Sequence, residues 1–369
     1  MKACVVGYGM IDALGSNPDD CWNNLINDVD FHQPITNIFI PTKEVRCSTA
    51  LFPEHTPGDP SLPRTLRYGI YAAEQALSMS RLPKSKNVAT IFSSLTGGNS
   101  TFDRMITTGE RTKPKTAIKL PIDALCSHIS MQHGFMGINT AIYSACATGL
   151  VCIDYAIRLL DEYDYVIVGG SDAGVNGIDL DIFSSLRALG SKSRPFDNAR
   201  DGFIMGEGAG CIILQSEEKA IAYGSTIHAT ITGVANASDA YDETAPSGAG
   251  ARLCLSKLDL TDVDAVNAHG TGTPIGDRVE YDVVREFTNA PIYSNKGKIG
   301  HTFAAAGILE TIYSILSIKH GVIPHTANCI DCDMDIVKTN IQQPVHKVLS
   351  NSFGFGGKCC SIIIEDYHV

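Results

Sequence analysis

The chain has 369 residues, of which 44% are hydrophobic and 19% charged, a composition typical of a soluble globular protein. Its net charge of -11 disfavours nonspecific binding to nucleic acid, because phosphates attract a basic surface. No apolar run is long enough to span a membrane, and the amino terminus lacks a signal-peptide pattern. We therefore expect a cytoplasmic protein, without membrane or nucleic-acid partners, whose 12 cysteines are reduced.

Strand-like and helix-like segments alternate along the chain. Short apolar or β-branched runs predict buried strands at Ala3 to Val6, Val88 to Phe92, Tyr165 to Val168, Cys211 to Leu214, Ile227 to Gly233, Val263 to Ala268 and Ser361 to Ile364. Helix-spaced apolar positions predict helices at Tyr68 to Met79, Leu150 to Leu160 and Ala304 to Lys319. This alternation favours an α/β layered fold with a largely buried sheet.

A faint internal symmetry suggests two halves. Each half opens with a strand and a glycine-containing turn, so that Val5-Val6-Gly7-Tyr8-Gly9 is roughly matched by Ile231-Thr232-Gly233-Val234. This similarity does not by itself establish a duplication. It favours a boundary near Ser216 to Ala220, which divides the chain into residues 1–216 and 217–369.

Cys146 lies among small residues directly before a predicted helix, in Tyr143-Ser144-Ala145-Cys146-Ala147-Thr148-Gly149. Small residues permit a sharp turn that exposes the sulfur at the helix amino terminus. There the helix dipole and the free N–H groups would lower the pKa of the thiol. A buried structural cysteine explains this segment equally well when it is taken alone.

Two histidines lie at the ends of predicted strands, where α/β enzymes carry their chemistry. His269 opens a loop rich in glycine and threonine, which lacks the Lys-Ser/Thr ending of a phosphate-binding loop. His301 precedes a helix rich in small residues and is flanked by Lys296 and Glu310, either of which alone could be an ordinary surface charge. The aromatic-glycine turn Asn351 to Gly357 could line a site with its backbone N–H groups.

Together, these segments around Cys146, His269, His301 and Phe355 resemble the β-ketoacyl synthase family of condensing enzymes. Similar motifs follow in the expected order over nearly the whole chain, at Val5 to Met10, Arg194 to Gly210 and Ser238 to Tyr241. The resemblance implies a thiolase-like α-β-α-β-α fold built from two similar halves. It also implies decarboxylative condensation of an acyl group with malonyl-acyl carrier protein, giving β-ketoacyl-acyl carrier protein and CO2, without a metal or other cofactor.

The resemblance also implies a role for each matching residue. Cys146 would be the acylated nucleophile of the elongating Cys-His-His subclass, and Phe355 would be a gate that shares the oxyanion hole with Cys146. The other expected catalytic residues are His269, His301, Lys296 and Glu310, and the expected substrate-binding residues are Thr271, Thr273, Phe102, Phe183 and Phe353. Phe102 would either shorten the acyl tunnel or pack in the core, and Asp242 stands where many relatives carry histidine.

The partners implied by the resemblance are an acidic acyl carrier protein and a second copy of the chain, with a heterodimer as the alternative. Candidate docking residues for the carrier are Arg64, Arg67, Lys113, Lys115 and Lys119. The last three belong to a basic stretch, Arg111 to Lys119, that could equally be a solvated loop.

Other functions remain alternatives. A noncatalytic chain-length-factor subunit is disfavoured because such subunits usually lack the nucleophilic cysteine, whereas fatty acid and polyketide or polyene pathways are not separated. His320, His325, Cys329 and Cys332 could form a metal module, although their spacing fits no standard zinc pattern. Dinucleotide binding at Gly7-Tyr8-Gly9 is rejected, because Asp12 stands where the third glycine is needed.

Overall fold

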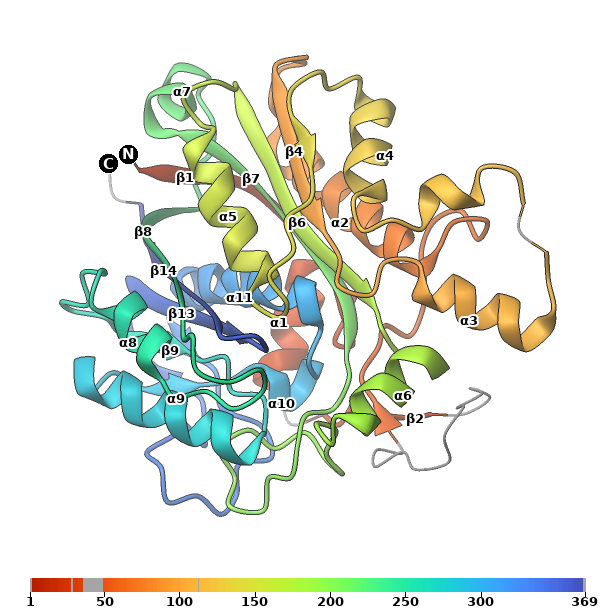
Figure 1. Ribbon diagram of the computed structural model, residues 1–369. Helices are drawn as coiled ribbons and strands as arrows, with labels where there is room; N and C mark the ends of the chain where they lie inside the picture. The colour runs from red at the N-terminus through yellow and green to blue at the C-terminus, as the bar shows by residue number, and fades with distance from the viewer. Residues whose placement is uncertain (1, 28, 36–48, 112, 368–369) are drawn as a thin grey trace.

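A computed structural model describes residues 2–27, 29–35, 49–111 and 113–367 of the chain. Within these ranges a sheet of 10 strands runs through the molecule in the order β10-β9-β13-β14-β8-β1-β7-β6-β4-β5 (Figure 1). No helix in these ranges is long and apolar enough to cross a bilayer.

The first half contains β1 (Ala3–Ile11), α1 (Pro18–Ile26), β2 (Gln33–Pro34), β3 (Thr49–Ala50), α2 (Arg64–Ser80), β4 (Val88–Ser93), α3 (Asn99–Thr108), the 3-10 helix η1 (Thr116–Lys119), α4 (Ala124–His133), β5 (Asn139–Thr140), α5 (Thr148–Arg158), β6 (Tyr165–Ala173), α6 (Gly177–Ser185) and β7 (Glu207–Ser216).

The second half contains α7 (Glu217–Ala222), β8 (Ala229–Ser238), α8 (Ala249–Leu255), β9 (Ala265–Asn267), α9 (Pro274–Phe287), β10 (Ile292–Tyr293), α10 (Lys296–Ile299), the 3-10 helix η2 (Phe303–Ala305), α11 (Ala306–His320), β11 (Val322–Ile323), β12 (Ile341–Gln342), β13 (Lys347–Gly354) and β14 (Lys358–Glu365).

The two halves repeat one pattern of strand pairing. In the first, β1 pairs antiparallel with β7 and β7 with β6, whereas β6 pairs parallel with β4 and β4 with β5. In the second, β8 pairs antiparallel with β14 and β14 with β13, whereas β13 pairs parallel with β9 and β9 with β10. The halves meet where β1 pairs antiparallel with β8. The expected thiolase-like fold of two similar halves is confirmed, and we retain the boundary after Ser216 as a proposal.

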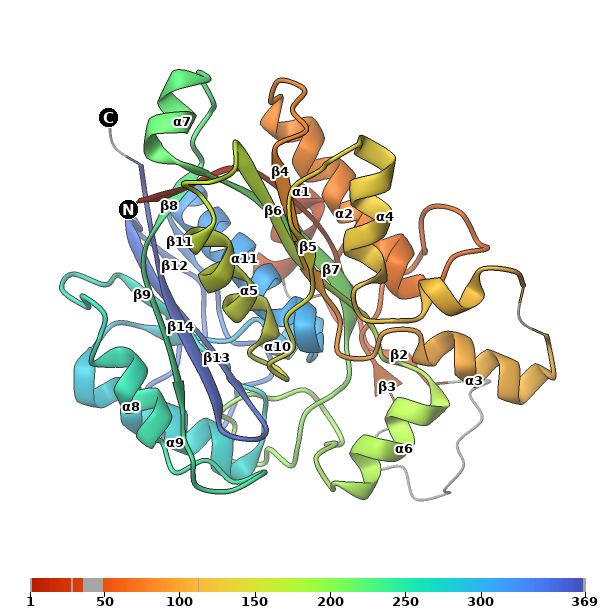
Figure 2. The ribbon, with the colours of Figure 1, turned by 45° about the horizontal axis from the view of Figure 1, so that its top comes forward.

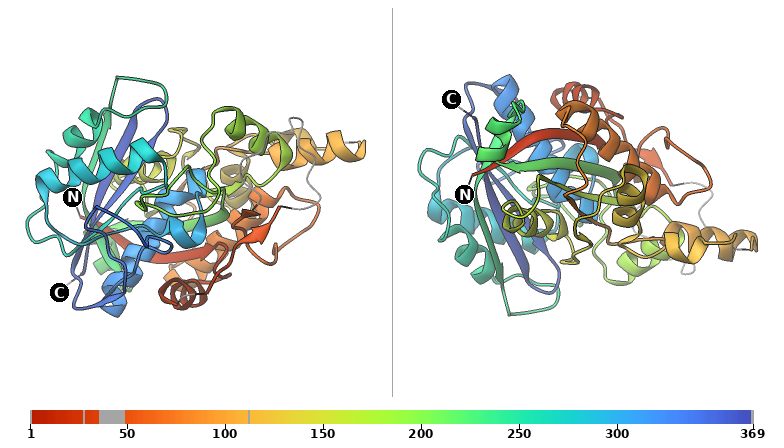
Figure 3. Two further views of the ribbon diagram at one scale, coloured as in Figure 1. Left: turned by 90° about the horizontal axis from the view of Figure 1, so that it is seen from below. Right: turned by 90° about the horizontal axis from the view of Figure 1, so that it is seen from above.

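The layers follow from which faces the helices cover. Helices α5 and α11 contact strands of both halves and each other, so they form the central layer (Figure 2). Residues 306–317 of α11 are buried on every side, as expected for a helix enclosed between sheets. Helices α2 and α4 cover the outer face of the first half, and α8 covers that of the second (Figure 3). The order of layers is therefore α-β-α-β-α.

All seven predicted strands and all three predicted helices are present, although several bounds differ. The first strand continues to Ile11 because Gly7 and Gly9 let α2 lie directly against it. A Cβ atom at Gly9 would lie 2.3 Å from the carbonyl oxygen of Ala72 in α2, closer than any real contact. The glycines that suggested a turn therefore serve close packing of a helix on a strand.

We predict that Gly9→Val destabilises the fold by about 1–3 kcal/mol, because the added methyl groups force α2 away from β1. Urea-induced unfolding followed by circular dichroism measures the change. Gly233→Ala is the matched control in β8, since its new methyl group would meet the flexible end of Leu258. Equal stability of Gly9→Val and the wild type would contradict the packing argument.

Candidate active site

Cys146 lies in a sharp turn that leads into α5. Ala145 adopts a left-handed backbone conformation with φ of 47°, and the N–H of Ala147 donates to the carbonyl of Ser144 at 3.0 Å. The hydroxyl of Thr148 accepts from the N–H of Ser144 at 2.8 Å and donates to the carbonyl of Ala145 at 2.6 Å. These bonds stabilise the strained turn and direct Cys146 into a cavity at the amino end of α5.

The thiol of Cys146 is protonated in the free protein. Burial raises the pKa of Cys146 to about 12, although the ammonium of Lys296 and the backbone N–H groups of Phe355 and Cys146 lower it. The expectation that the helix end would favour the thiolate was therefore wrong. The reason is physical: Cys146 is only 8% exposed, and the loss of hydration of the anion outweighs the helix end.

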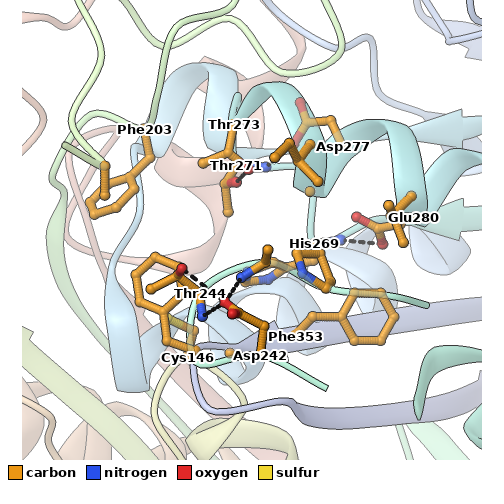
Figure 4. Close-up of a pocket in the computed structure, with 18 of the residues that line it drawn as sticks. Cys146, Phe203, Asp242, Thr244, His269, Thr271, Thr273, Asp277, Glu280 and Phe353 are labelled. Atoms are coloured by element: carbon orange, nitrogen blue, oxygen red, sulfur yellow. Dashed lines mark hydrogen bonds between the residues drawn. The ribbon is translucent and has the colours of Figure 1, made fainter. Parts of the chain in front are cut away.

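His269, His301 and Cys146 line the same cavity. Figure 4 shows Cys146 and His269 in it. The ring centroids of the two histidines are 5.4 Å apart, with the rings nearly perpendicular. Burial lowers the pKa of both imidazoles well below the ordinary value, and the nearby charge of Lys296 lowers both further. Both histidines are therefore neutral at physiological pH.

The hydrogen bonds of each imidazole determine which nitrogen carries the proton. Nζ of Lys296 lies 3.5 Å from Nδ1 of His269, and an ammonium can only donate, so Nδ1 accepts. The backbone N–H of Phe303 donates to Nδ1 of His301 at 3.3 Å. Both histidines therefore carry their proton on Nε2. Nε2 of His301 is buried and has no hydrogen-bond partner among the described residues, which leaves this N–H for a bound ligand.

A fully buried ion pair joins Lys296 of α10 to Glu310 of α11. Burial raises the pKa of Glu310 to about 7, and the ammonium of Lys296 opposes this increase. Burying both charges costs hydration energy that the pair regains only in part, so such a pair is weak evidence for stability. A functional reason explains the ion pair better, because the pair places the ammonium of Lys296 beside His269, next to the cavity.

Two further carboxylates, which the sequence motifs did not single out, support the loop of His269. Glu280 accepts the backbone N–H groups of His269 and Gly270, each at 2.8 Å. Asp277 accepts those of Thr271 and Gly272 at 2.9 and 3.0 Å. Their spacing in the sequence could have indicated this role. Asp277 and Glu280 are three residues apart, which places both carboxylates on one face of the helix that follows the loop.

The cavity has a volume of about 250 Å³ and collects most of the expected substrate-binding residues. Its lining includes Thr271, Thr273, Phe183, Phe353 and Phe355. Asp242 also lines it and accepts the backbone N–H groups of Thr244 and Ala245 at 2.8 and 2.9 Å (Figure 4). Phe102 does not belong to this lining, because it lies on α3 with 42% of its surface exposed.

The candidate docking residues fall into two groups. Arg64 donates to Glu207 at 2.7 Å and to the carbonyl of Val175 at 3.0 Å, and Arg67 donates to the carbonyls of Pro57 and Thr56. These bonds engage both guanidinium groups within the fold, which disfavours them as carrier contacts. Lys113 and Lys115 are exposed and Lys119 is half-buried, so these lysines remain candidates.

The proposed metal module does not assemble. His320 stacks on Trp22 with centroids 5.2 Å apart, whereas Nδ1 of His325 forms a 2.9 Å hydrogen bond with the side-chain oxygen of Asn340. Across the described part of the chain there is no group of three or more His, Cys, Asp or Glu side chains placed to hold a metal ion. The metal-binding interpretation is therefore wrong for these residues.

Comparison with known proteins identifies the family of the chain. The profile of the β-ketoacyl synthase N-terminal domain matches residues 2–220, and that of the C-terminal domain matches residues 228–330. The chain belongs to the β-ketoacyl synthase family. A 3-oxoacyl-acyl-carrier-protein synthase 2 of Staphylococcus aureus is 30% identical over 100% of this synthase and 99% of the relative.

Two other similar proteins extend the comparison. The mitochondrial 3-oxoacyl-acyl-carrier-protein synthase of Arabidopsis thaliana is 37% identical over 284 residues, which cover 69% of this chain and 62% of the relative. The solved structure of the ishigamide ketosynthase/chain length factor superposes with a TM-score of 0.89 at 27% identity, covering 100% of this chain and 99% of the other. This synthase is thus an acyltransferase that catalyses the condensation typical of its family.

We predict that alkylation of Cys146 by iodoacetamide accelerates about tenfold per pH unit, without a plateau below about pH 10, because burial raises the pKa of the thiol. Lys296→Met should slow alkylation at a given pH by about tenfold or more, since the ammonium of Lys296 lowers that pKa. Peptide mass spectrometry after timed labelling gives the rate at Cys146.

Lys84→Met, which removes an exposed ammonium, is the matched control and should leave the rate unchanged. A plateau near neutral pH in the wild type would mean that Cys146 is already a thiolate. Circular dichroism of Lys296→Met checks that the variant is folded.

Proposed function

We propose that this synthase condenses a Cys146-bound acyl group with malonyl-acyl carrier protein by means of His269 and His301. The observation that carries the proposal is that one cavity holds the thiol together with two neutral imidazoles whose Nε2 atoms are protonated. A nucleophile beside two preorganised donors suits a reaction that forms an acyl-enzyme and then an enolate.

In the first step, the sulfur of Cys146 attacks the carbonyl carbon of the acyl thioester. The C–S bond to the carrier breaks, and the proton of Cys146 leaves with the carrier thiol. The backbone N–H groups of Cys146 and Phe355 approach the sulfur, so they are well placed to stabilise the oxyanion beside it. The high pKa of the thiol means that proton loss accompanies the attack.

In the second step, malonyl-acyl carrier protein loses CO2, and the electron pair of the broken C–C bond forms an enolate. The Nε2–H groups of His269 and His301 donate to its oxygen. Each such donor is worth about 3–4 kcal/mol in comparable enzymes. The enolate carbon then attacks the acyl carbon on Cys146, forming the new C–C bond and releasing Cys146 as a thiolate that regains a proton from water.

In this scheme Lys296 keeps His269 and His301 neutral, so that each imidazole can donate its Nε2–H. Its ammonium near Nδ1 of His269 fixes the tautomer, and its charge holds both imidazoles neutral. Glu310 balances that charge. A protonated imidazole would be a stronger donor but would carry its own buried charge, which the adjacent ammonium disfavours.

The pantetheine arm and the acyl chain of the substrate contact the remaining walls of the cavity. We assign the pantetheine contacts to Thr271 and Thr273, whose hydroxyl groups lie 3.1 Å apart. Phe355 is the proposed gate, and the following Gly356 and Gly357 have φ values of 76° and 69°, conformations that favour glycine and suit a hinge. Phe183 and Phe353 supply apolar walls.

We propose that a second copy of the chain covers the side that carries α3, α4 and β5. Strand β5 is an edge of the sheet. On α3, on α4 and beside β5, five large apolar side chains are exposed, namely Phe102, Ile106, Met131, Met136 and Tyr143. Exposed apolar side chains beside an unpaired strand edge are typical of an interface. The ishigamide ketosynthase/chain length factor is a pairing of unlike chains, so a heterodimer is the alternative.

Both the pathway and the cellular location belong to the proposal. The curated relatives are named for 3-oxoacyl-acyl-carrier-protein synthesis, whereas the similar solved structure is an ishigamide ketosynthase. Fatty acid and polyketide or polyene synthesis are therefore both supported. The intact Cys-His-His set disfavours a noncatalytic subunit, and the cytoplasm is the proposed location.

We predict that incubation with acyl-acyl carrier protein substrates of graded length adds one acyl mass to the wild type and none to Cys146→Ala. Intact-mass spectrometry measures the gain, and the lengths that load identify the pathway. Cys332→Ala removes a partly exposed thiol and is the matched control, which should load like the wild type. Equal loading of Cys146→Ala would overturn the assignment of the nucleophile.

A charge reversal tests the docking surface. We predict that Lys113→Glu combined with Lys115→Glu raises the KM for the carrier substrate about five- to tenfold and flattens its dependence on salt, with kcat unchanged. Steady-state kinetics at several ionic strengths measures both effects. Lys257→Glu, an exposed reversal on the other half, is the control. An unchanged salt response would place the carrier elsewhere.

A further inference from the structure

A buried carboxylate at the end of β6 connects the loop after β4 with the turn that follows His301. Asp172 is fully buried and accepts hydrogen bonds from five donors. Four come from the loop after β4, namely the hydroxyl of Ser94 at 2.6 Å, the N–H of Leu95 at 3.0 Å, and the N–H and hydroxyl of Thr96, both at 2.8 Å. The fifth is the N–H of Ala304 at 2.7 Å, which donates to the other carboxylate oxygen, Oδ2, where the N–H of Leu95 also lies within 3.2 Å.

The bond to Ala304 places Asp172 one residue away from the group that orients His301. Ala304 lies in η2, and the preceding Phe303 is the residue whose N–H donates to Nδ1 of His301. Phe303 has a φ of 52°, an unfavourable conformation for a bulky residue that must be maintained by its surroundings. Oδ2 of Asp172 therefore anchors the turn that fixes the tautomer of His301.

A neutral group could not replace this anchor. Five N–H and O–H donors converge on two oxygen atoms, and only an ionised carboxylate has acceptor sites for nearly all of them. The amide of an asparagine in place of Asp172 would point its NH2 group either at the donors of the loop after β4 or at the N–H of Ala304. The hydrogen bonds on that side would then be lost. The negative charge of Asp172 also makes the thiolate of Cys146 harder to form, because it raises the pKa of this thiol. The benefit of Asp172 must therefore lie in a step other than activation of the thiol.

We propose that Asp172 is a positioning residue for the decarboxylation step, acting through η2 to present the Nε2–H of His301 to the enolate. This inference rests on the proposed condensing function. Asp172 does not touch the substrate in this role. Its removal should therefore affect the malonyl half-reaction that needs His301, and should spare acyl transfer to Cys146.

The test separates the two half-reactions of Asp172→Asn. Release of CO2 from malonyl-acyl carrier protein should fall about 10- to 100-fold, approaching the loss in His301→Ala. Acyl loading of Cys146, followed by intact mass, should stay within about threefold of the wild type. Alkylation of Cys146 at fixed pH should become faster, because a negative charge near the thiol has been removed.

A readout independent of activity is the nitrogen NMR spectrum of the imidazole of His301. The wild type should show an unprotonated Nδ1 and a protonated Nε2, whereas Asp172→Asn should show a mixture of the two tautomers. If Asp172→Asn does not fold, Asp172→Glu keeps the charge but displaces the oxygens. It should slow decarboxylation with little change in alkylation.

Two matched controls separate positioning from general support of the fold. Ser94→Ala removes a donor to Asp172 on the side away from Ala304, and should leave the ratio of the half-reactions unchanged. Asp12→Asn alters another fully buried, hydrogen-bonded carboxylate, and should lower the melting temperature without separating the half-reactions. Equal slowing of loading and decarboxylation by Asp172→Asn, or an unchanged tautomer, would overturn the proposal. A wild type that neither loads nor decarboxylates would instead reject the condensing function.

Discussion

The buried ammonium of Lys296 is the charge on which the chemistry of the site depends. It is held by Glu310 in the central helix layer and lies beside Nδ1 of His269. From this position it lowers the pKa of both histidines and opposes the effect of burial on Cys146. One buried positive charge beside the cavity thus favours the neutral form of both imidazoles and partly compensates the cost of forming a thiolate.

That charge acts on all three groups only because the two halves of the fold meet at the cavity. Cys146 precedes α5 of the first half, whereas His269 follows β9 and His301 follows α10 of the second. Helices α5 and α11 contact each other in the central layer, and Cys146 lies close enough to Lys296 for the ammonium to lower the pKa of the thiol. The repeated strand order therefore has a functional consequence, since each half supplies a part of the site that the other lacks.

Carboxylates that bind backbone N–H groups hold this junction in place. Glu280 and Asp277 organise the loop of His269, and Asp172 links η2 to the loop after β4. None of these acids needs to contact substrate to matter, because the direction of an N–H donor decides whether it can stabilise a developing charge. The active site thus depends on loops whose backbone is fixed by buried carboxyl groups.

The sequence by itself predicted seven of the strands, three main helices and the family, and it singled out Cys146, His269 and His301 as candidate site residues, because these inferences depend on local periodicity and on motifs in one order. Only the tertiary structure decided that the thiol is protonated, that Arg64 is bonded inside the fold, that Phe102 lies outside the cavity, and that Asp172 reaches Ala304, 132 residues away in sequence. The physical reason is that hydration and hydrogen bonding depend on which distant residues surround a group, and local sequence does not contain that information.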